Sequence, residues 1–135
     1  MIGYITLGAT DLSAAAVFYD AVLGQLGATR SHSDAQLVGW RFPSGGSELY
    51  VLRPYDGNGA QAGNGPMVAL YAGSRTLVEA VYAKAIESGA SDEGKPGLRP
   101  YSVGFYAGYF RDLDGNKLNV FCFEHANSSG SHIEA

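Results

Sequence analysis

The sequence repeats itself at about half its length, and this duplication restricts the folds open to the chain more than any other feature. Near the end of each half the motif Gly-x-x-Leu-x-Val recurs, at residues 46–51 and 115–120. Further matching positions, all at one constant spacing, are Tyr4 and Met67, Tyr19 and Tyr82, Val22 and Ala85, and Leu23 and Ile86. Each half alone would leave one sheet face uncovered, so we expect two similar units related by a pseudo-two-fold axis.

Each half has the pattern of a strand, an amphipathic helix and further strands. In the first half Thr10-Asp11 caps a helix that begins at Leu12, and in the second Ser74 has the same role. The strands expected in the first half are 2–8, 28–33, 36–42 and 48–53, and those in the second are 67–72, 105–111 and 117–124. The second half lacks one strand of the pattern, and residues 97–100 are predicted to be a loop.

These elements predict an α+β fold of two βαβββ modules that form a concave mixed sheet with the helices on its outer face. We expect one domain over residues 1–124, with modules at 1–53 and 67–124. Residues 54–66, rich in Gly, Asn and Ala, form the expected linker. Residues 125–135 are polar and are expected to be a flexible tail.

Composition excludes several classes of protein. The 135 residues carry a net charge of -4 without a Lys/Arg cluster, which argues against nucleic-acid binding. The sequence contains neither a long apolar run of the kind that spans a bilayer nor a signal peptide at its start. Cys122 is the single cysteine, so no internal disulfide can form and a cytoplasmic location is expected.

Strand alternation separates the side chains of the core from those of the concave face. Leu49 and Val51 in one strand, and Leu118 and Val120 in another, should lie under the helices. The opposite faces of these strands, and the matching faces of the first strand of each half, carry polar and aromatic side chains that should line the concavity; these include Tyr4, Thr6, Glu48, Tyr50, Met67, Lys117, Asn119, Phe121 and Phe123.

Several stretches resemble the vicinal oxygen chelate superfamily, which contains glyoxalases, bleomycin resistance proteins and extradiol dioxygenases. They are Tyr4–Leu12, Phe18–Leu23, Gly65–Leu70 and Phe110–Leu118. The resemblance covers nearly the whole chain apart from the tail. It implies the fold described above and a homodimer, in which modules pack edge to edge or are exchanged between chains.

The resemblance also implies four positions for metal ligands, usually His on the first strand of each half and Glu or His on the last. In this sequence they hold Tyr4, Tyr50, Met67 and Asn119. A divalent metal that chelates two substrate oxygens needs hard nitrogen and oxygen donors, and phenol, thioether and amide groups are poor ones. We therefore expect no metal and no other cofactor. The histidines His32, His125 and His132 match none of the four positions.

A concavity without a metal can still bind a small molecule. The expected ligand-binding residues are Tyr4, Trp40, Glu48, Tyr50, Met67, Arg99, Tyr101, Asn119 and Phe121. Their aromatic and apolar character suits a flat or aliphatic compound, with Arg99 favouring an anionic group. Alternatively, the same side chains simply fill the concavity.

Three hypotheses about function follow. The first is a metal-free protein, similar to the bleomycin resistance branch, that binds a small, partly aromatic or apolar molecule. The second is an enzyme, a lyase, isomerase or dioxygenase, with an atypical site in which Glu48 beside Tyr50 is the candidate acid or base. The third is an interaction module whose concave surface binds a protein partner.

Overall fold

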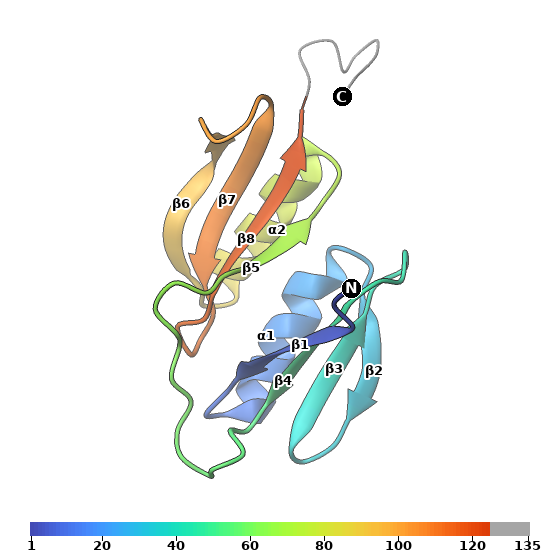
Figure 1. Ribbon diagram of the computed structural model, residues 1–135, viewed down its shortest axis with the longest axis vertical. Helices are drawn as coiled ribbons and strands as arrows, with labels where there is room; N and C mark the ends of the chain where they lie inside the picture. Colours follow the sequence, from blue (N-terminus) through green and yellow to red (C-terminus); the bar gives the residue numbers. More distant parts are fainter. Residues whose placement is uncertain (125–135) are drawn as a thin grey trace.

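The computed structural model describes residues 1–124 and contains the expected order of strand, helix and three strands twice (Figure 1). In the first module the elements are β1 (Tyr4–Gly8), α1 (Leu12–Gly24), β2 (Thr29–Ser33), β3 (Leu37–Arg41) and β4 (Glu48–Leu52). In the second module they are β5 (Val68–Tyr71), α2 (Arg75–Glu87), β6 (Ser91–Leu98), β7 (Phe105–Arg111) and β8 (Lys117–Phe123). The predicted α+β fold of two βαβββ modules is confirmed. The expected tail, with His125 and His132, lies outside the described residues.

The concave surface is divided between two four-stranded mixed sheets, with strand orders β1-β4-β3-β2 and β5-β8-β7-β6. In each sheet the first strand of the module runs parallel to the last, and the other pairs are antiparallel. Within residues 1–124 no strand of one sheet pairs with a strand of the other. The two modules therefore each have a sheet face of their own.

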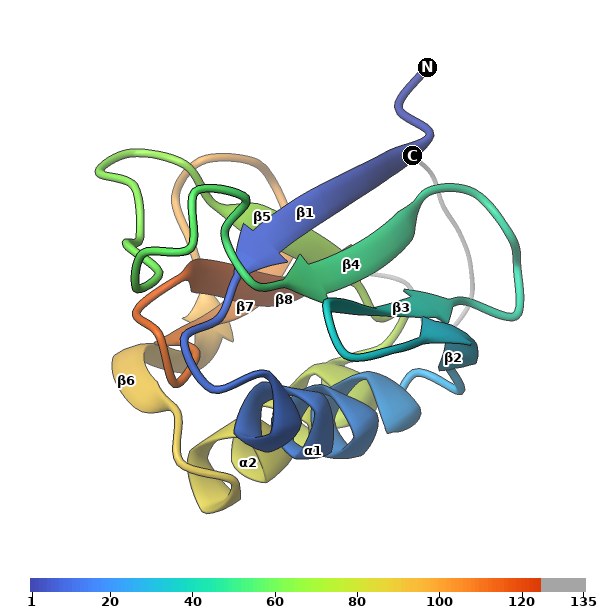
Figure 2. The ribbon, with the colours of Figure 1, turned by 90° about the horizontal axis from the view of Figure 1, so that it is seen from below.

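The helices cover one face of the sheets and pack against each other (Figure 2). Both begin at the predicted caps: Asp11 accepts a 3.0 Å hydrogen bond from the amide of Ala14, and Ser74 accepts one of 3.1 Å from the amide of Leu77. Such caps satisfy backbone donors that have no partner within the helix. Because both helices lie on the same side, the opposite faces of the two sheets carry no helix.

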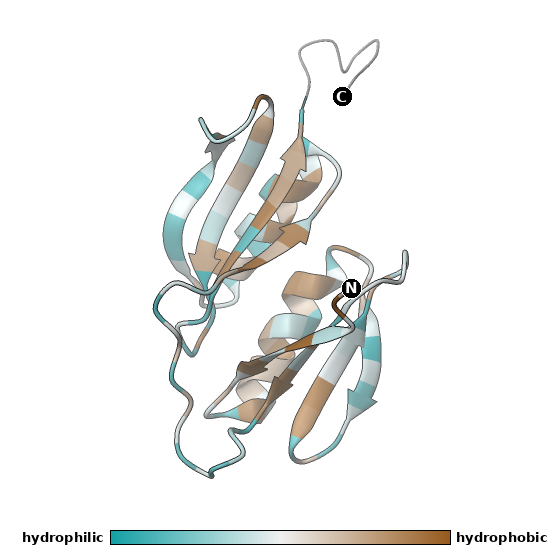
Figure 3. Ribbon diagram, viewed as in Figure 1, coloured by the Kyte–Doolittle hydropathy of each residue, from teal (hydrophilic) through white to brown (hydrophobic). Residues whose placement is uncertain are grey.

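The core lies between the helices and the sheets, as strand alternation predicts. Leu49, Val51, Leu118 and Val120 are all buried, and so is Cys122 between them and α2. The inner strands are correspondingly apolar, whereas the outer strands β2 and β6 are mostly hydrophilic (Figure 3). Burial raises the pKa of the Cys122 thiol, which fits a core residue better than a nucleophile.

The prediction missed β6. Residues 91–98 contain Gly94, Pro96 and Gly97, which break the strand pattern and make the segment resemble a loop. In the structure they form the outer strand of the second sheet and pair with β7 through two irregular registers. An edge strand tolerates Pro and bulges because one side of its backbone needs no ladder partner.

The turn between β7 and β8 holds the two modules together. The Asp114 carboxylate accepts a 2.9 Å hydrogen bond from the backbone amide of Thr10, and the side-chain Nδ2 of Asn116 donates one of 3.0 Å to the carbonyl of Gly8. These contacts lie at the end of β1, so the turn of the second module fixes the start of α1 in the first. Asp114, at the Asp-Gly step of this turn, therefore has a structural role.

No helix within residues 1–124 has the length and apolar character needed to cross a lipid bilayer.

Candidate functional site

The four positions that correspond to metal ligands lie in two pairs. Tyr4 and Tyr50 lie on the helix-free face of the first sheet, with ring centroids 5.3 Å apart. Met67 and Asn119 line one hollow on the helix-free face of the second sheet. Neither Tyr4 nor Tyr50 lines that hollow. One chain therefore brings the four side chains together only as pairs, because its two sheets are not continuous.

Glu48 is the centre of a polar cluster on the first sheet. Its carboxylate accepts a 3.1 Å hydrogen bond from the Tyr50 hydroxyl and one of 2.9 Å from Ser31. Gly39 in β3 gives the Tyr50 ring its position, since a Cβ atom there would lie 2.9 Å from the ring. The predicted neighbours Glu48 and Tyr50 are thus in direct contact, at a partly buried site.

The hollow on the second sheet has a volume of about 840 Å³ and lies mainly over β7 and β8. The side chains that line it are Asn64, Pro66, Met67, Ala69, Tyr101, Phe105, Tyr109, Arg111, Lys117, Asn119, Phe121 and Phe123, with Gly65. Met67, Tyr101, Asn119 and Phe121 were expected to bind ligand, whereas Phe105, Tyr109 and Lys117 were missed. Strand alternation along residues 105–111 could have found Phe105 and Tyr109, and it had placed Lys117 on this face without naming it as ligand-binding.

Aromatic rings form one end of this hollow. Phe105 lies 5.6 Å from both Phe121 and Phe123, measured between ring centroids, and 6.4 Å from Tyr101. Tyr101 and Phe123 are well exposed. Rings at these distances offer both faces and edges to a flat molecule.

Asn119 lies deeper in the same hollow and is 2% exposed. Its Oδ1 atom has no hydrogen-bond partner within residues 1–124. A buried polar atom without a partner is costly, so such atoms are rare in folded proteins. Asn119 is therefore an unusual buried polar residue at the base of the hollow.

Positive charge lies at the other end of the hollow. The Lys117 ammonium group lies 5.6 Å from the centroid of the Tyr109 ring, and the Arg99 guanidinium lies 5.3 Å from the same centroid. Arg99 is tied to the backbone by hydrogen bonds to the carbonyls of Lys95 and Ala107, and it does not line the hollow. Among the described residues, Lys117 forms no ion pair, whereas Arg111 pairs with Glu93 at 3.2 Å.

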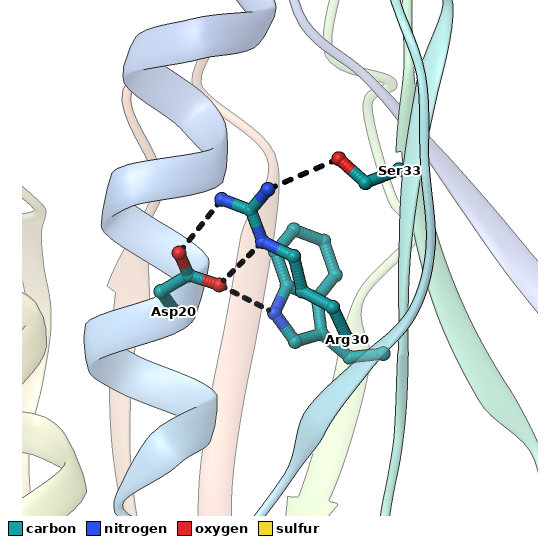
Figure 4. Close-up of polar contacts among 4 residues, drawn as sticks. Asp20, Arg30 and Ser33 are labelled. Atoms are coloured by element: carbon teal, nitrogen blue, oxygen red, sulfur yellow. Dashed lines mark hydrogen bonds and ion pairs between the residues drawn. The ribbon is translucent and has the colours of Figure 1, made fainter.

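Trp40 lies elsewhere than expected. It is 1% exposed, packs against Tyr19 under α1, and donates a 2.9 Å hydrogen bond from its indole nitrogen to Asp20. Asp20 also receives two hydrogen bonds from Arg30 (Figure 4). The Arg30 hydrogen bond, helped by that of Trp40, lowers the pKa of Asp20. Trp40 belongs to the core because it alternates in phase with Val38, which faces the helix.

A smaller hollow of about 410 Å³ separates the two modules and is largely apolar. Ile5, Leu49 and Phe42 line it from the first module, and Val68 and Leu77 line it from the second. Glu48 reaches its edge.

The residues present do not fit a divalent metal of the kind the resemblance implies. The four positions offer two phenols, a thioether and an amide, and within residues 1–124 no group of three or more His, Cys, Asp or Glu side chains could hold a metal ion. His32 is paired with Asp34 at 2.7 Å on the surface, and this contact lowers the pKa of Asp34 to about 2. The four positions therefore supply no carboxylate or imidazole donor for a catalytic metal, and the Glu48 carboxylate on the first sheet belongs to no such group of three or more within residues 1–124.

Comparison with known families and structures identifies the fold. The profile of the Glyoxalase/Bleomycin resistance protein/Dioxygenase superfamily matches residues 1–120. No curated protein matches the sequence.

Among solved structures, a glyoxalase/bleomycin resistance protein from Albidiferax ferrireducens T118 is 31% identical, with a TM-score of 0.81 over 90% of this chain and 98% of that chain. A lactoylglutathione lyase from Agrobacterium tumefaciens is 26% identical, with a TM-score of 0.66 over 90% of this chain and 92% of that chain. A glyoxalase-related enzyme from Fulvimarina pelagi, at 20% identity and a TM-score of 0.74 over 90% of this chain and 87% of that chain, shares the fold. The chain therefore belongs to the Glyoxalase/Bleomycin resistance protein/Dioxygenase superfamily.

Proposed function

We propose that the protein binds a small, partly aromatic or apolar molecule without a metal ion, in the hollow over β7 and β8. One observation carries this proposal: a hollow of about 840 Å³ combines a wall of aromatic rings with a buried amide, Asn119, whose Oδ1 lacks a partner. Ligand sites typically combine an apolar lining with a few polar groups that fix orientation. Asn119 stands where metal-dependent relatives have a ligand, so the same position would contact the bound molecule directly.

We also propose a homodimer in which modules are exchanged between chains. The helix-free faces expose large apolar side chains: Tyr4 and Tyr71 are 64% exposed, Phe123 is 47% exposed and Met67 is 42% exposed. Large apolar side chains that are exposed on the helix-free faces of both sheets favour association of these faces with another protein surface. If the first sheet of one chain covers the second sheet of its partner, Tyr4 and Tyr50 face Met67 and Asn119, and the hollow becomes closed.

We also propose that the protein is located in the cytoplasm. Cys122 is its single cysteine and is buried in the core, so the fold needs no oxidising environment.

Calorimetric titration with Ni²⁺, Zn²⁺ and Fe²⁺, followed by thermal-shift measurements with a panel of aromatic and aliphatic compounds, tests the binding proposal. We expect no stoichiometric metal binding and a saturable increase in Tm with aromatic compounds. Tight binding of one metal per site, or ligand binding that needs added metal, would contradict it.

An enzyme of the same superfamily is the second candidate, and the contact between Glu48 and Tyr50 favours it. The carboxylate is partly buried, is oriented by Tyr50 and Ser31, and borders the apolar hollow between the modules. A lyase or isomerase would use such a carboxylate to move a proton at a carbon next to a carbonyl. Turnover that is lost in Glu48→Gln but kept in Glu93→Gln would support this candidate, and absence of turnover with every metal supplied would reject it.

A further inference from the structure

We infer that Glu48 of one chain and Lys117 of the partner subunit form an ion pair across the interface of the exchanged dimer. This inference rests on the proposed function, and it adds the contact that selects which surface covers the hollow over β7 and β8. The covering surface is then the helix-free face of the first sheet of a second copy of the chain. Lys117 lines the hollow from β8, and Glu48 lies on β4 of the covering sheet.

The internal duplication places the two charges at equivalent positions. The motif repeated at residues 46–51 and 115–120 aligns Glu48 with Lys117. Glu48 is the first residue of β4 and Lys117 is the first residue of β8, and each strand pairs in parallel with the first strand of its own module. The two modules therefore carry opposite charges at one position of the same scaffold.

Within residues 1–124 neither charge has a counter-ion. The half-buried Glu48 carboxylate accepts hydrogen bonds from two neutral hydroxyl groups, that of Ser31 at 2.9 Å and that of Tyr50 at 3.1 Å, and it forms no ion pair. The half-buried Lys117 ammonium group lies 5.6 Å from the centroid of the Tyr109 ring and likewise forms none. Such a pair of charges attracts when two protein surfaces bring them together.

The proposed dimer brings the two charges to the same interface. In that dimer Tyr50 of one chain faces Asn119 of the other. Glu48 is hydrogen-bonded to Tyr50, and Lys117 lines the same hollow as Asn119. An interface that excludes water lowers the effective dielectric constant, so the attraction between the carboxylate and the ammonium group acts over several ångströms.

The same two charges act against other ways of covering the sheets. If two first sheets covered each other, the Glu48 carboxylates of both chains would approach. If two second sheets covered each other, the Lys117 ammonium groups would approach. Like charges at an interface disfavour the wrong partner surface. The charges therefore select the first sheet of one chain for the second sheet of the other, and two-fold symmetry forms this interface twice.

Charge-reversal variants of the intact protein test the inference by sedimentation velocity over a range of concentrations. Glu48→Lys and Lys117→Glu each place like charges at both interfaces, so each should raise the Kd of the dimer about tenfold. The double variant Glu48→Lys/Lys117→Glu restores opposite charges and should return the Kd to within about threefold of that of the unmodified protein. Glu87→Lys is the matched control, because Glu87 is exposed on α2 and pairs with Lys84, and it should leave the Kd unchanged.

A mixture of the two single variants shows whether the ion pair joins different chains. When a chain with Glu48→Lys meets a chain with Lys117→Glu, each interface again has one positive and one negative charge. Carrying different fluorophores, the two chains should form mixed dimers with a Kd about tenfold below that of either variant alone. Mixing would have no such effect if the ion pair formed within one chain.

The outcomes separate this inference from the proposal on which it rests. An unmodified protein that stays monomeric at every concentration would overturn the proposed dimer and the ion pair with it. A dimer whose Kd is the same in Glu48→Lys, Lys117→Glu and Glu87→Lys would overturn the ion pair and leave the dimer standing. A dimer that both single reversals weaken, and that neither the double variant nor the mixture restores, would also overturn the ion pair.

The unmodified protein supplies a test that needs no folded variant. Salt screens charges at the surfaces of the separated chains, so the Kd of the dimer should rise as NaCl is increased from about 0.05 to 0.5 M. A Kd that does not rise over this range would overturn the ion pair. Thermal unfolding of each variant shows whether it is folded.

Discussion

The hydroxyl group of Tyr19 in α1 donates a 2.6 Å hydrogen bond to the buried carboxylate of Asp112, which follows β7 in the other module. Asp112 also accepts hydrogen bonds from the amides of Asp114 and Asn116 in its own turn. One carboxylate therefore fixes both the turn and its contact with the first module. This contact, together with the packing of α1 on α2, sets how the two sheet faces lie relative to each other.

Removal of the Tyr19 hydroxyl should destabilise the fold. Tyr19→Phe leaves Asp112 with one hydrogen bond fewer at a buried site, so the free energy of unfolding should fall by about 1–3 kcal/mol. Chemical denaturation measures the change. Tyr82→Phe is the matched control, because its partner Asp92 is exposed, and it should have a smaller effect. Equal losses in the two variants would contradict the structural role of the Tyr19 contact.

Stability should fall at alkaline pH. Burial and the Asp112 carboxylate raise the pKa of Tyr19 well above 10.0, and burial followed by a carboxylate hydrogen bond raises the pKa of Tyr82 and Tyr106 to about 12. Because the folded pKa values exceed the unfolded value, the stabilisation is complete below pH 10 and is lost as the pH rises through 12. Tyrosinate absorbance measures the pKa values, and chemical denaturation at a series of pH values measures the loss of stability. Ionisation of all tyrosines near pH 10 without unfolding would contradict the expected pH dependence.

Gly39→Val should displace the Tyr50 ring, because even a Cβ atom at residue 39 would lie 2.9 Å from it. The ring is partly exposed and can move outward, so we expect a cost of about 1 kcal/mol and loss of its contact with Glu48. Tyr50→Phe is the comparison, since it removes the hydroxyl and keeps the ring. A crystal structure of the Val variant with the Tyr50–Glu48 hydrogen bond intact would contradict the expectation.

Placing His and Glu side chains at the four positions that correspond to metal ligands should create a metal site only if the protein forms a dimer in which modules are exchanged between chains. The variant with Tyr4→His, Tyr50→Glu, Met67→His and Asn119→Glu carries two donors on each sheet. In an exchanged dimer the four converge, and calorimetry should find one tightly bound Zn²⁺ or Ni²⁺ per chain. The double variant Tyr4→His/Tyr50→Glu should bind metal weakly. Failure of the quadruple variant to bind metal while it is folded would contradict the proposed assembly.

Much of the fold could be predicted because its signals are local. The duplication, the caps at Asp11 and Ser74 and the alternation of apolar residues each depend on nearby residues, and the structure confirms them. The strand β6 was missed because Gly94, Pro96 and Gly97 remove the local pattern, while its pairing with β7 depends on tertiary contact. Division into two sheets is likewise a long-range property that no segment encodes alone.

The candidate site was predicted less completely for a similar physical reason. Alternation placed Asn119, Phe121 and Met67 on the correct face, and these line the hollow. Alternation was not applied to residues 37–41, where it would have placed Trp40 in phase with Val38 in the core, so the expectation that Trp40 binds ligand was wrong. The position of Lys117 on this face follows from alternation, but its contact with Tyr109 on the neighbouring strand depends on strand pairing and could not be predicted from either segment alone.

A crystal structure of the protein grown with Zn²⁺ and an aromatic compound that raises its Tm, with diffraction recorded at the zinc absorption edge, tests the central claim most directly. The account predicts ligand density against Asn119 and Phe121 and no anomalous peak within bonding distance of Tyr4, Tyr50, Met67 or Asn119. An anomalous peak coordinated by these residues, with the hollow over β7 and β8 otherwise filled by side chains, would contradict it.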